Sequence, residues 1–206
     1  SEGGVRKQLI ATQFESHHAR EVFPCVDEPE AKATFDLTLE YANGQKILAN
    51  TNLASEVIAE TTTTTFGRTP KMSTYLLAFV VGDLQKKTAR TKNGVEVSTW
   101  STKVHNLDML DFPLEVAIKS LEFYEDYFGV KFPLEKCDHI ALPDFSSGAM
   151  ENWGLITYRE TAMLANAKSS LSSKRQIALV IAHETAHQWF GNLVTMRWWY
   201  DLWLNE

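Results

Sequence analysis

The chain has 206 residues, of which 44% are hydrophobic and 22% charged, a composition typical of a globular protein with one large core or two small ones. The formal net charge of −6 argues against a surface for nucleic acid or anionic membranes and is compatible with cationic peptides. No stretch approaches 18 apolar residues, so we predict no membrane segment, and residues 1–4 resemble neither a signal peptide nor an anchor.

The first part of the chain predicts β-strands separated by turns. Three segments have the alternating or continuously apolar pattern of strands: residues 34–41, 46–49 and 74–81. Asn43-Gly44 lies between the first two and predicts a hairpin. Residues 57–65 end in five consecutive threonines, which favours an exposed β-branched strand or its loop. A domain boundary is expected near Leu84.

After residue 84 the pattern changes to mixed strands and helices. We expect a hairpin of residues 87–91 and 95–101, a helix from a cap at Asp111 to Gly129, and strands at 139–142 and 153–158. The prediction is an α+β fold, with a β-rich N-terminal domain over residues 1–84 and a second domain over residues 85–206. Cys25 and Cys137 are too few for a disulfide framework or a cysteine-based zinc site, although a single bridge stays open.

Two histidines and a glutamate at the end of the chain have the spacing of a zinc site. His183 and His187 are four residues apart, so both lie on one face of a helix, and Glu206 follows after 18 intervening residues. Two imidazoles and one carboxylate leave the fourth position of a catalytic zinc open to water. Glu184 lies about 100° further around the helix and is expected to activate a zinc-bound water.

The segments around these residues predict two helices. The apolar residues 177–182 suit a helix packed inside a domain, with the serines 172–173 before it and Phe190-Gly191 at its end. A second helix capped by Asp201 would turn Glu206 toward the histidines. The histidines could also make ordinary polar contacts in a core, but on an apolar helix their burial without a metal would be costly.

Such a metal would lower the pKa of its water to about 7 and polarise a carbonyl. Glu184 would accept the water proton and pass it to a leaving amine. The motif therefore predicts hydrolysis of a peptide or amide bond.

A second motif, residues 148–152, enters a predicted strand. Its small residues allow an extended peptide to approach the backbone and pair with it as an added strand. Glu151 is placed to bind a cation such as the α-ammonium of a peptide. Alone, the motif is better explained by a solvated glutamate in a loop.

Together, these motifs resemble the aminopeptidase N family of zinc metallopeptidases, the gluzincin aminopeptidases. The resemblance covers residues 12–15, 19–20, 23–25, 27–29, 148–154, 183–192, 198–199 and 201–206. It implies the C-terminal part of a β-saddle domain over residues 1–84, followed by the N-terminal part of a thermolysin-like peptidase domain over residues 85–206, truncated at the third zinc ligand.

The resemblance also implies roles for individual residues. His183, His187 and Glu206 match the ligands of one Zn²⁺ per chain, and Glu184 matches the general base. Glu151 matches the glutamate that holds the free amine of a peptide. The other implied substrate-binding residues are Glu15 as a second acidic contact to the amine, and Gln13, Gly148, Ala149 and Met150 around the pocket for the first side chain.

The chain departs from the family pattern in two residues and in its extent. Thr185 stands where the family commonly has Leu, and Tyr200 where Asn is common. The family's oxyanion-stabilising tyrosine lies beyond the position of Glu206. We therefore expect the rest of the catalytic domain and a helical C-terminal domain in the remainder of the same polypeptide. The isolated piece is expected to be inactive, because losing an oxyanion donor costs about 10²–10³ in rate.

The function that the resemblance implies is a zinc-dependent aminopeptidase, a hydrolase that removes N-terminal amino acids from peptides with a free amine. Two alternatives remain open at this point: a bifunctional epoxide hydrolase with aminopeptidase activity, and a non-catalytic peptide-binding relative. The compartment also remains open, because relatives include soluble cytosolic and membrane-tethered enzymes.

Overall fold

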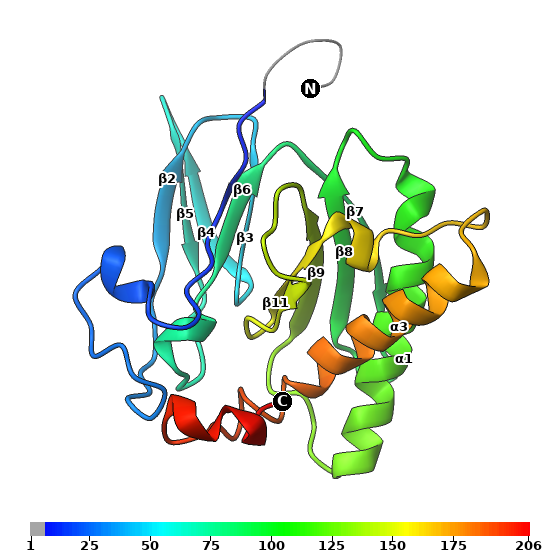
Figure 1. Ribbon diagram of the computed structural model, residues 1–206. Helices are drawn as coiled ribbons and strands as arrows, with labels where there is room; N and C mark the ends of the chain where they lie inside the picture. The colour runs from blue at the N-terminus through cyan, green and yellow to red at the C-terminus, as the bar shows by residue number, and fades with distance from the viewer. Residues whose placement is uncertain (1–6) are drawn as a thin grey trace.

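The computed structural model describes residues 7–206, and the first six residues of the predicted N-terminal domain lie outside this described part. Figure 1 shows the N-terminal strands on the left and a larger sheet with helices α1 and α3 on the right. The chain thus mixes sheets with segregated helices, which confirms the predicted α+β class.

Two three-stranded antiparallel sheets form the N-terminal part. The first has the order β1-β6-β3, made of β1 (Ile10–Ala11), β6 (Phe79–Gly82) and β3 (Lys46–Ala49). The second has the order β2-β5-β4, made of β2 (Thr38–Tyr41), β5 (Thr62–Phe66) and β4 (Leu53–Ile58). Two 3-10 helices accompany them, η1 (Ala19–Glu21) and η2 (Thr74–Leu76). The predicted strand at residues 74–81 is therefore helical in its first turn.

The hairpin predicted around Asn43-Gly44 is wrong, because its two strands belong to different sheets: β2 pairs with β5, and β3 pairs with β6. The side chain of Asn43 explains the difference. Its Nδ2 donates to Ala59 O at 2.9 Å, and its Oδ1 accepts from Thr62 Oγ1 at 2.6 Å. These hydrogen bonds hold the turn against the connection between β4 and β5. β2, which leads into the turn, therefore lies beside β5 and pairs with it.

The threonine run is a strand, but it is not exposed. β5 is the central strand of its sheet, and Thr64 is 0% exposed while Thr62 is also buried. The hydroxyl of Thr64 lies 2.9 Å from Tyr41 Oη, which satisfies it inside the sheet. Threonine combines a β-branched shape with a polar group that a neighbouring strand can bond, so it fits this central position.

The second part is built on one five-stranded sheet with the order β10-β11-β9-β8-β7. Its strands are β7 (Leu84–Arg90), β8 (Glu96–Thr102), β9 (Lys136–Leu142), β10 (Ala149–Met150) and β11 (Leu155–Arg159). β7 and β8 form the predicted second hairpin, whereas β8, β9 and β11 run parallel. The predicted loop before residue 153 thus contains a short edge strand, β10, antiparallel to β11.

β9 lies at the centre of this sheet and is buried along its whole length, as expected for a strand covered on both faces. Its residues alternate between two cores. Cys137 and Ala141 pack in a core that includes residues of α1 and α3, whereas Ile140 and Leu142 pack against Leu48 and other residues of the N-terminal part. The sheet is therefore the middle layer between the helices and the N-terminal strands.

The helices cover one face of this sheet. They are α1 (Asp111–Phe128), α2 (Glu160–Met163) and α3 (Leu171–Ala186), with the 3-10 helix η3 (Leu107–Leu110). A further 3-10 helix, η4 (Trp199–Leu204), lies below the sheets in the view of Figure 1. α1 ends at Gly129, as predicted, where φ is 64°. Asp111 is not its cap, because it is already helical and its carboxylate instead accepts from Lys87 Nζ at 2.5 Å.

Two further expectations concern the cysteines and membranes. Cys25 and Cys137 are both free thiols, so the single bridge left open by the sequence does not form. None of the helices between residues 7 and 206 combines the length and apolar character that crossing a bilayer requires.

Candidate metal centre

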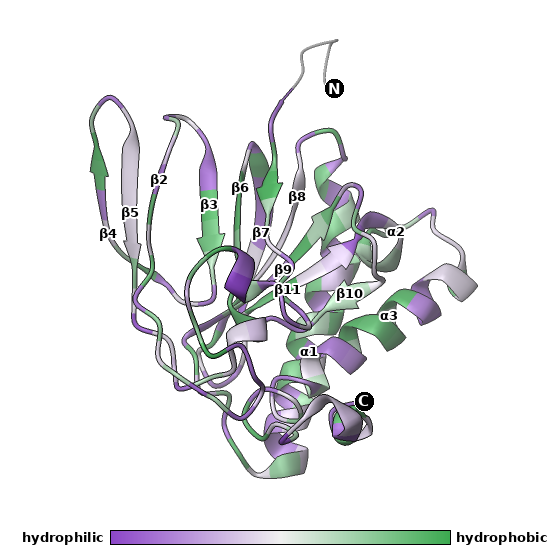
Figure 2. Ribbon diagram, turned by 60° about the vertical axis from the view of Figure 1, so that its left-hand side comes forward, coloured by the Kyte–Doolittle hydropathy of each residue, from purple (hydrophilic) through white to green (hydrophobic). Residues whose placement is uncertain are grey.

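α3 carries the candidate ligand His183, and the candidate ligand His187 directly follows its last residue as the C-cap. The bounds and the burial of this helix differ from the prediction. It begins at Leu171, because Ser170 caps it by accepting from the backbone N of Ser173 at 3.1 Å, so residues 172–173 lie inside the helix. It ends at Ala186. Figure 2 shows its apolar middle between more polar ends. Only one face of this stretch is buried, and Leu179 is 64% exposed.

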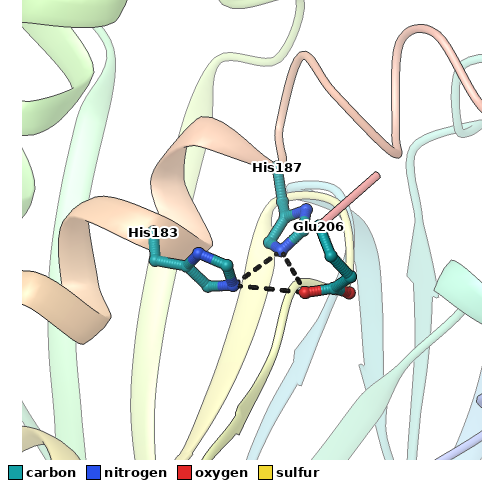
Figure 3. A group of neighbouring side chains, drawn as sticks. All are labelled: His183, His187 and Glu206. Atoms are coloured by element: carbon teal, nitrogen blue, oxygen red, sulfur yellow. Dashed lines mark hydrogen bonds and ion pairs between the residues drawn. The ribbon is translucent and has the colours of Figure 1, made fainter. Parts of the chain in front are cut away.

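The structure brings His183, His187 and Glu206 together, as the side chains in Figure 3 show. The Nε2 atoms of the two histidines are 3.0 Å apart. Glu206 Oε2 lies 3.5 Å from His183 Nε2 and 3.6 Å from His187 Nε2. Ligand bonds of about 2.0–2.1 Å in a tetrahedral arrangement separate the ligand atoms by about 3.3 Å. The three atoms therefore fit around one zinc ion.

η4 turns Glu206 toward the histidines, although it does not begin at the predicted cap. Its N-cap is Trp198, and Asp201 lies inside it with φ −100° and ψ 19°. Beyond its end, the backbone N of Glu206 donates to Leu202 O at 3.1 Å, which continues the helical turn. The predicted direction of Glu206 is thus right, and the predicted start of the helix is wrong.

The surroundings of the two histidines suit a pair of metal ligands. His187 Nδ1 lies 3.0 Å from Phe190 O, a carbonyl that can only accept, so Nδ1 carries the proton and Nε2 presents its lone pair. The pKa of His183 is lowered mainly by burial and also by His187, while Glu206 opposes the shift. The lowered pKa of His183 favours its neutral imidazole, the form that binds zinc.

Glu184 supplies an independent test of whether a metal fits. Its side chain is only 6% exposed, and its Oε2 has no hydrogen-bond partner within residues 7–206. Burial is the main cause that raises its pKa to about 9, and the nearby carboxylates of Glu151, Glu206 and Glu15 raise it further. Several carboxylates in so small a space favour a cation among them. The donor set and this unpartnered oxygen therefore fit a divalent metal.

Glu151 lies beside the candidate metal centre. One ligand atom each from Glu151, Glu184 and His187 lie within 4.8 Å of one another, and all three residues are buried. Burial raises the pKa of Glu151 to about 7, Glu206 adds to the shift, and a hydrogen bond from its own backbone opposes it. A cationic group that entered here would stabilise the ionised carboxylate.

The other residues of the 148–152 motif lie along the edge of the sheet. β10 pairs only with β11, so its other side is the end of the sheet. At Gly148 a Cβ would meet no atom within 4 Å, so space is open there. The side chain of Met150 instead packs in the core, and Ala149 is half-buried against that core.

Glu15 lies near the candidate metal centre, whereas Gln13 is placed only in a cavity that it shares with Glu15. Both line an open cavity of about 570 Å³, together with Ser146 and Ser147, the residues that precede Gly148. The pKa of Glu15 is raised to about 7, first by burial and then by Glu151 and Glu206, while His187 lowers it. Glu15 therefore shares the electrostatic environment of the candidate metal centre.

Tyr75 is a member of the site that the sequence analysis missed. It belongs to η2, and its hydroxyl donates to Gly191 O and accepts from Asn205 Nδ2, each at 3.1 Å. Asn205 directly precedes Glu206, so this hydroxyl links the N-terminal part to both ligand-bearing segments. The tyrosine lies in an apolar run with no local signal of a polar role, which is why the sequence did not identify it.

Comparisons with known proteins match two domains of one peptidase family. The Peptidase M1 N-terminal domain matches residues 1–76, and the Peptidase family M1 domain matches residues 112–206. Aminopeptidase N of Lactococcus lactis subsp. lactis is 58% identical over 98% of this chain and 24% of its own length. Aminopeptidase N of Lactobacillus helveticus is 50% identical over 98% of the chain and 24% of its own length.

A more distant source gives the same result. The puromycin-sensitive aminopeptidase of Caenorhabditis elegans is 51% identical over 98% of this chain and 22% of its own length. The chain thus spans about a quarter of the length of the curated relatives it matches. Both domain matches occur in chain order, and the second contains all three candidate ligands, so this chain belongs to peptidase family M1.

Proposed function

We propose that the protein is a zinc-dependent aminopeptidase that removes N-terminal amino acids from peptides. The observation that carries this proposal is the proximity of Glu151 to Glu184 and His187, whose ligand atoms lie within 4.8 Å of one another. In a peptide, the α-amine nitrogen and the carbonyl carbon of the first residue are only about 2.5 Å apart. A carboxylate this close to the metal centre leaves room for one residue between the amine and the bond to be cleaved.

In this proposal, His183, His187 and Glu206 hold one zinc ion. When bound, the ion supplies Lewis-acid polarisation of a carbonyl and lowers the pKa of a water. Glu184 accepts the proton of the attacking water and delivers it to the nitrogen of the leaving peptide. Its raised pKa supports the role, because a buried carboxylate is a stronger base than an exposed one.

The substrate's free amine is held by Glu151 and Glu15. Both carboxylates have a pKa raised to about 7 by burial, and an ammonium group between them would offset that cost. The open edge of β10 supports backbone pairing with an extended peptide. Gln13, Gly148, Ala149 and Met150 would surround the first side chain, with Met150 acting through its backbone because its side chain is buried.

The same proposal assigns the two parts of the chain. We infer a β-saddle domain that ends near Leu84 and a thermolysin-like peptidase domain after it. The change of sheet supports this boundary, since β7 begins the five-stranded sheet at Leu84. Relatives with 50–58% identity carry the name aminopeptidase, which supports the activity.

The test compares two arylamide substrates on the protein in its full natural length. An aminoacyl-arylamide should be cleaved, its N-acetylated form should be spared, and a chelator should abolish cleavage. Glu184→Gln should also abolish it, whereas Glu115→Gln, an exposed glutamate on α1, should not. Equal cleavage of the acetylated substrate would refute the proposed exopeptidase.

A further inference from the structure

Gln188 connects the end of the metal-binding helix to the segment that contains Glu151. It directly follows the candidate ligand His187 and is 0% exposed. Its Nε2 donates to the backbone O of Glu151 at 3.0 Å, and its Oε1 accepts from the backbone N of Gly154 at 3.0 Å. One buried amide thus bonds to both ends of a four-residue segment.

Asn192 makes a second connection to the same atom. Its Nδ2 donates to Glu151 O at 2.8 Å, and its side chain is also 0% exposed. The backbone N of Asn192 donates to His187 O at 3.1 Å, which fixes it relative to that ligand. The carbonyl of Glu151 therefore accepts two hydrogen bonds from side chains that follow His187 by one and by five positions.

The segment is also held from its opposite side. Asn50 Nδ2 donates to Trp153 O at 2.9 Å, and Lys136 Nζ donates to Gly154 O at 2.8 Å. With both sides bonded, the backbone of Glu151 has a fixed position relative to His187. On the side of the candidate metal centre, this position is defined by the hydrogen bonds that the side-chain amides of Gln188 and Asn192 make.

We propose that Gln188 and Asn192 are positioning residues that set the separation between the amine-binding carboxylate and the metal centre. This inference rests on the proposed function, because it assumes that Glu151 binds the substrate's amine. Neither residue contacts the reacting atoms in this role. They act through Glu151, and they hold the amine site at the one-residue distance that restricts cleavage to the first peptide bond.

The test measures how much an α-amino group contributes to binding at the metal centre. The probes are an α-amino hydroxamate and its des-amino analogue, both of which bind zinc, and calorimetry on the zinc-loaded full-length protein gives their Kd values. In the unmodified protein the amino compound should bind more tightly. Equal Kd values in the unmodified protein would refute the proposed function itself and would be seen before any variant is made.

The variants Gln188→Met and Asn192→Leu keep the approximate shape and remove the amide. Each substitution should weaken binding of the α-amino hydroxamate by about 10–100-fold, because a displacement of Glu151 by about 1 Å is enough for such a loss. The des-amino analogue should keep its Kd within about twofold, and the zinc content should stay at one ion per chain.

Gln85→Met is the matched control. Its Nε2 also cross-links backbone, donating to His105 O at 2.7 Å, but β7 carries it on the far edge of the sheet. It should change neither Kd. Three outcomes would overturn the positioning role. The variants could weaken binding of both hydroxamates equally, they could leave the preference for the amino compound unchanged, or both Gln188→Met and Asn192→Leu could fail to fold.

Discussion

His139 provides a stability prediction whose size follows from the structure. It lies fully buried on β9, where Nδ1 is 2.8 Å from Tyr158 Oη and Nε2 is 3.6 Å from Cys137 Sγ. Burial lowers its pKa from 6.5 to about 4, with Lys136 adding to the shift and Asp138 opposing it. Between these two pH values the unfolded chain binds a proton at this histidine and the folded chain does not.

The sign and the size of the effect follow directly. Stability should fall as pH falls from about 6.5 to about 4, because the unfolded state binds more protons in that window. At 1.36 kcal/mol per pKa unit, this histidine contributes a loss of about 3 kcal/mol in the free energy of unfolding. The carboxylates of the chain add their own pH dependence, so the contribution of His139 has to be isolated by comparison.

The comparison is between the unmodified protein and His139→Asn, by urea unfolding at pH 7.5, 6, 5 and 4. Asn retains an acceptor for the hydroxyl of Tyr158 and does not titrate. The difference in unfolding free energy between the two proteins should shrink by about 3 kcal/mol from pH 7.5 to pH 4. If the free energies of unfolding of the two proteins changed in parallel with pH, burial would not lower the pKa of His139.

Three further substitutions test other contacts. Tyr75→Phe should weaken zinc affinity by about 10–100-fold in a chelator competition. An unchanged affinity would show that the hydroxyl does not help to position the candidate ligands. Lys136→Met leaves Asp138 buried without its cation and should cost about 3–5 kcal/mol in urea unfolding, so a loss below about 1 kcal/mol would contradict the pairing. Gly154→Ala places a Cβ against the backbone oxygen of Asn50 and should lower Tm more than Gly94→Ala, where φ is also positive but the space is open. Equal decreases in Tm would show that the structure relieves the clash.

The sequence predicted the parts of the site that depend on local spacing. His183 and His187 face the same way because a helix repeats every 3.6 residues, and this holds whatever surrounds the helix. The direction of Glu206 was predicted from the helical turn before it, although that 3-10 helix begins after Trp198 and not at the predicted cap Asp201. The boundaries of α3 were less predictable, since Ser170 and not the next serines supplies the cap.

The errors concern contacts between residues far apart in the chain. Asn43-Gly44 has the local signature of a hairpin, but its pairing was decided by Ala59 and Thr62, which no local pattern connects to it. The supports of the site are similar. Tyr75 contacts Asn205 across 130 positions, so only the folded structure shows that a residue in an apolar run makes a polar contact beside the candidate metal centre.

The two-residue length of β10 has a consequence for the solubility of the protein. A sheet edge exposes unpaired backbone groups, which makes a long edge a template for pairing with other chains. β10 ends the sheet with only Ala149 and Met150, too few to join a second sheet firmly. Its neighbour β11 extends beyond it at Leu155 and Ile156, both of which are buried. The edge can thus pair with a short extended chain but is too short to promote aggregation.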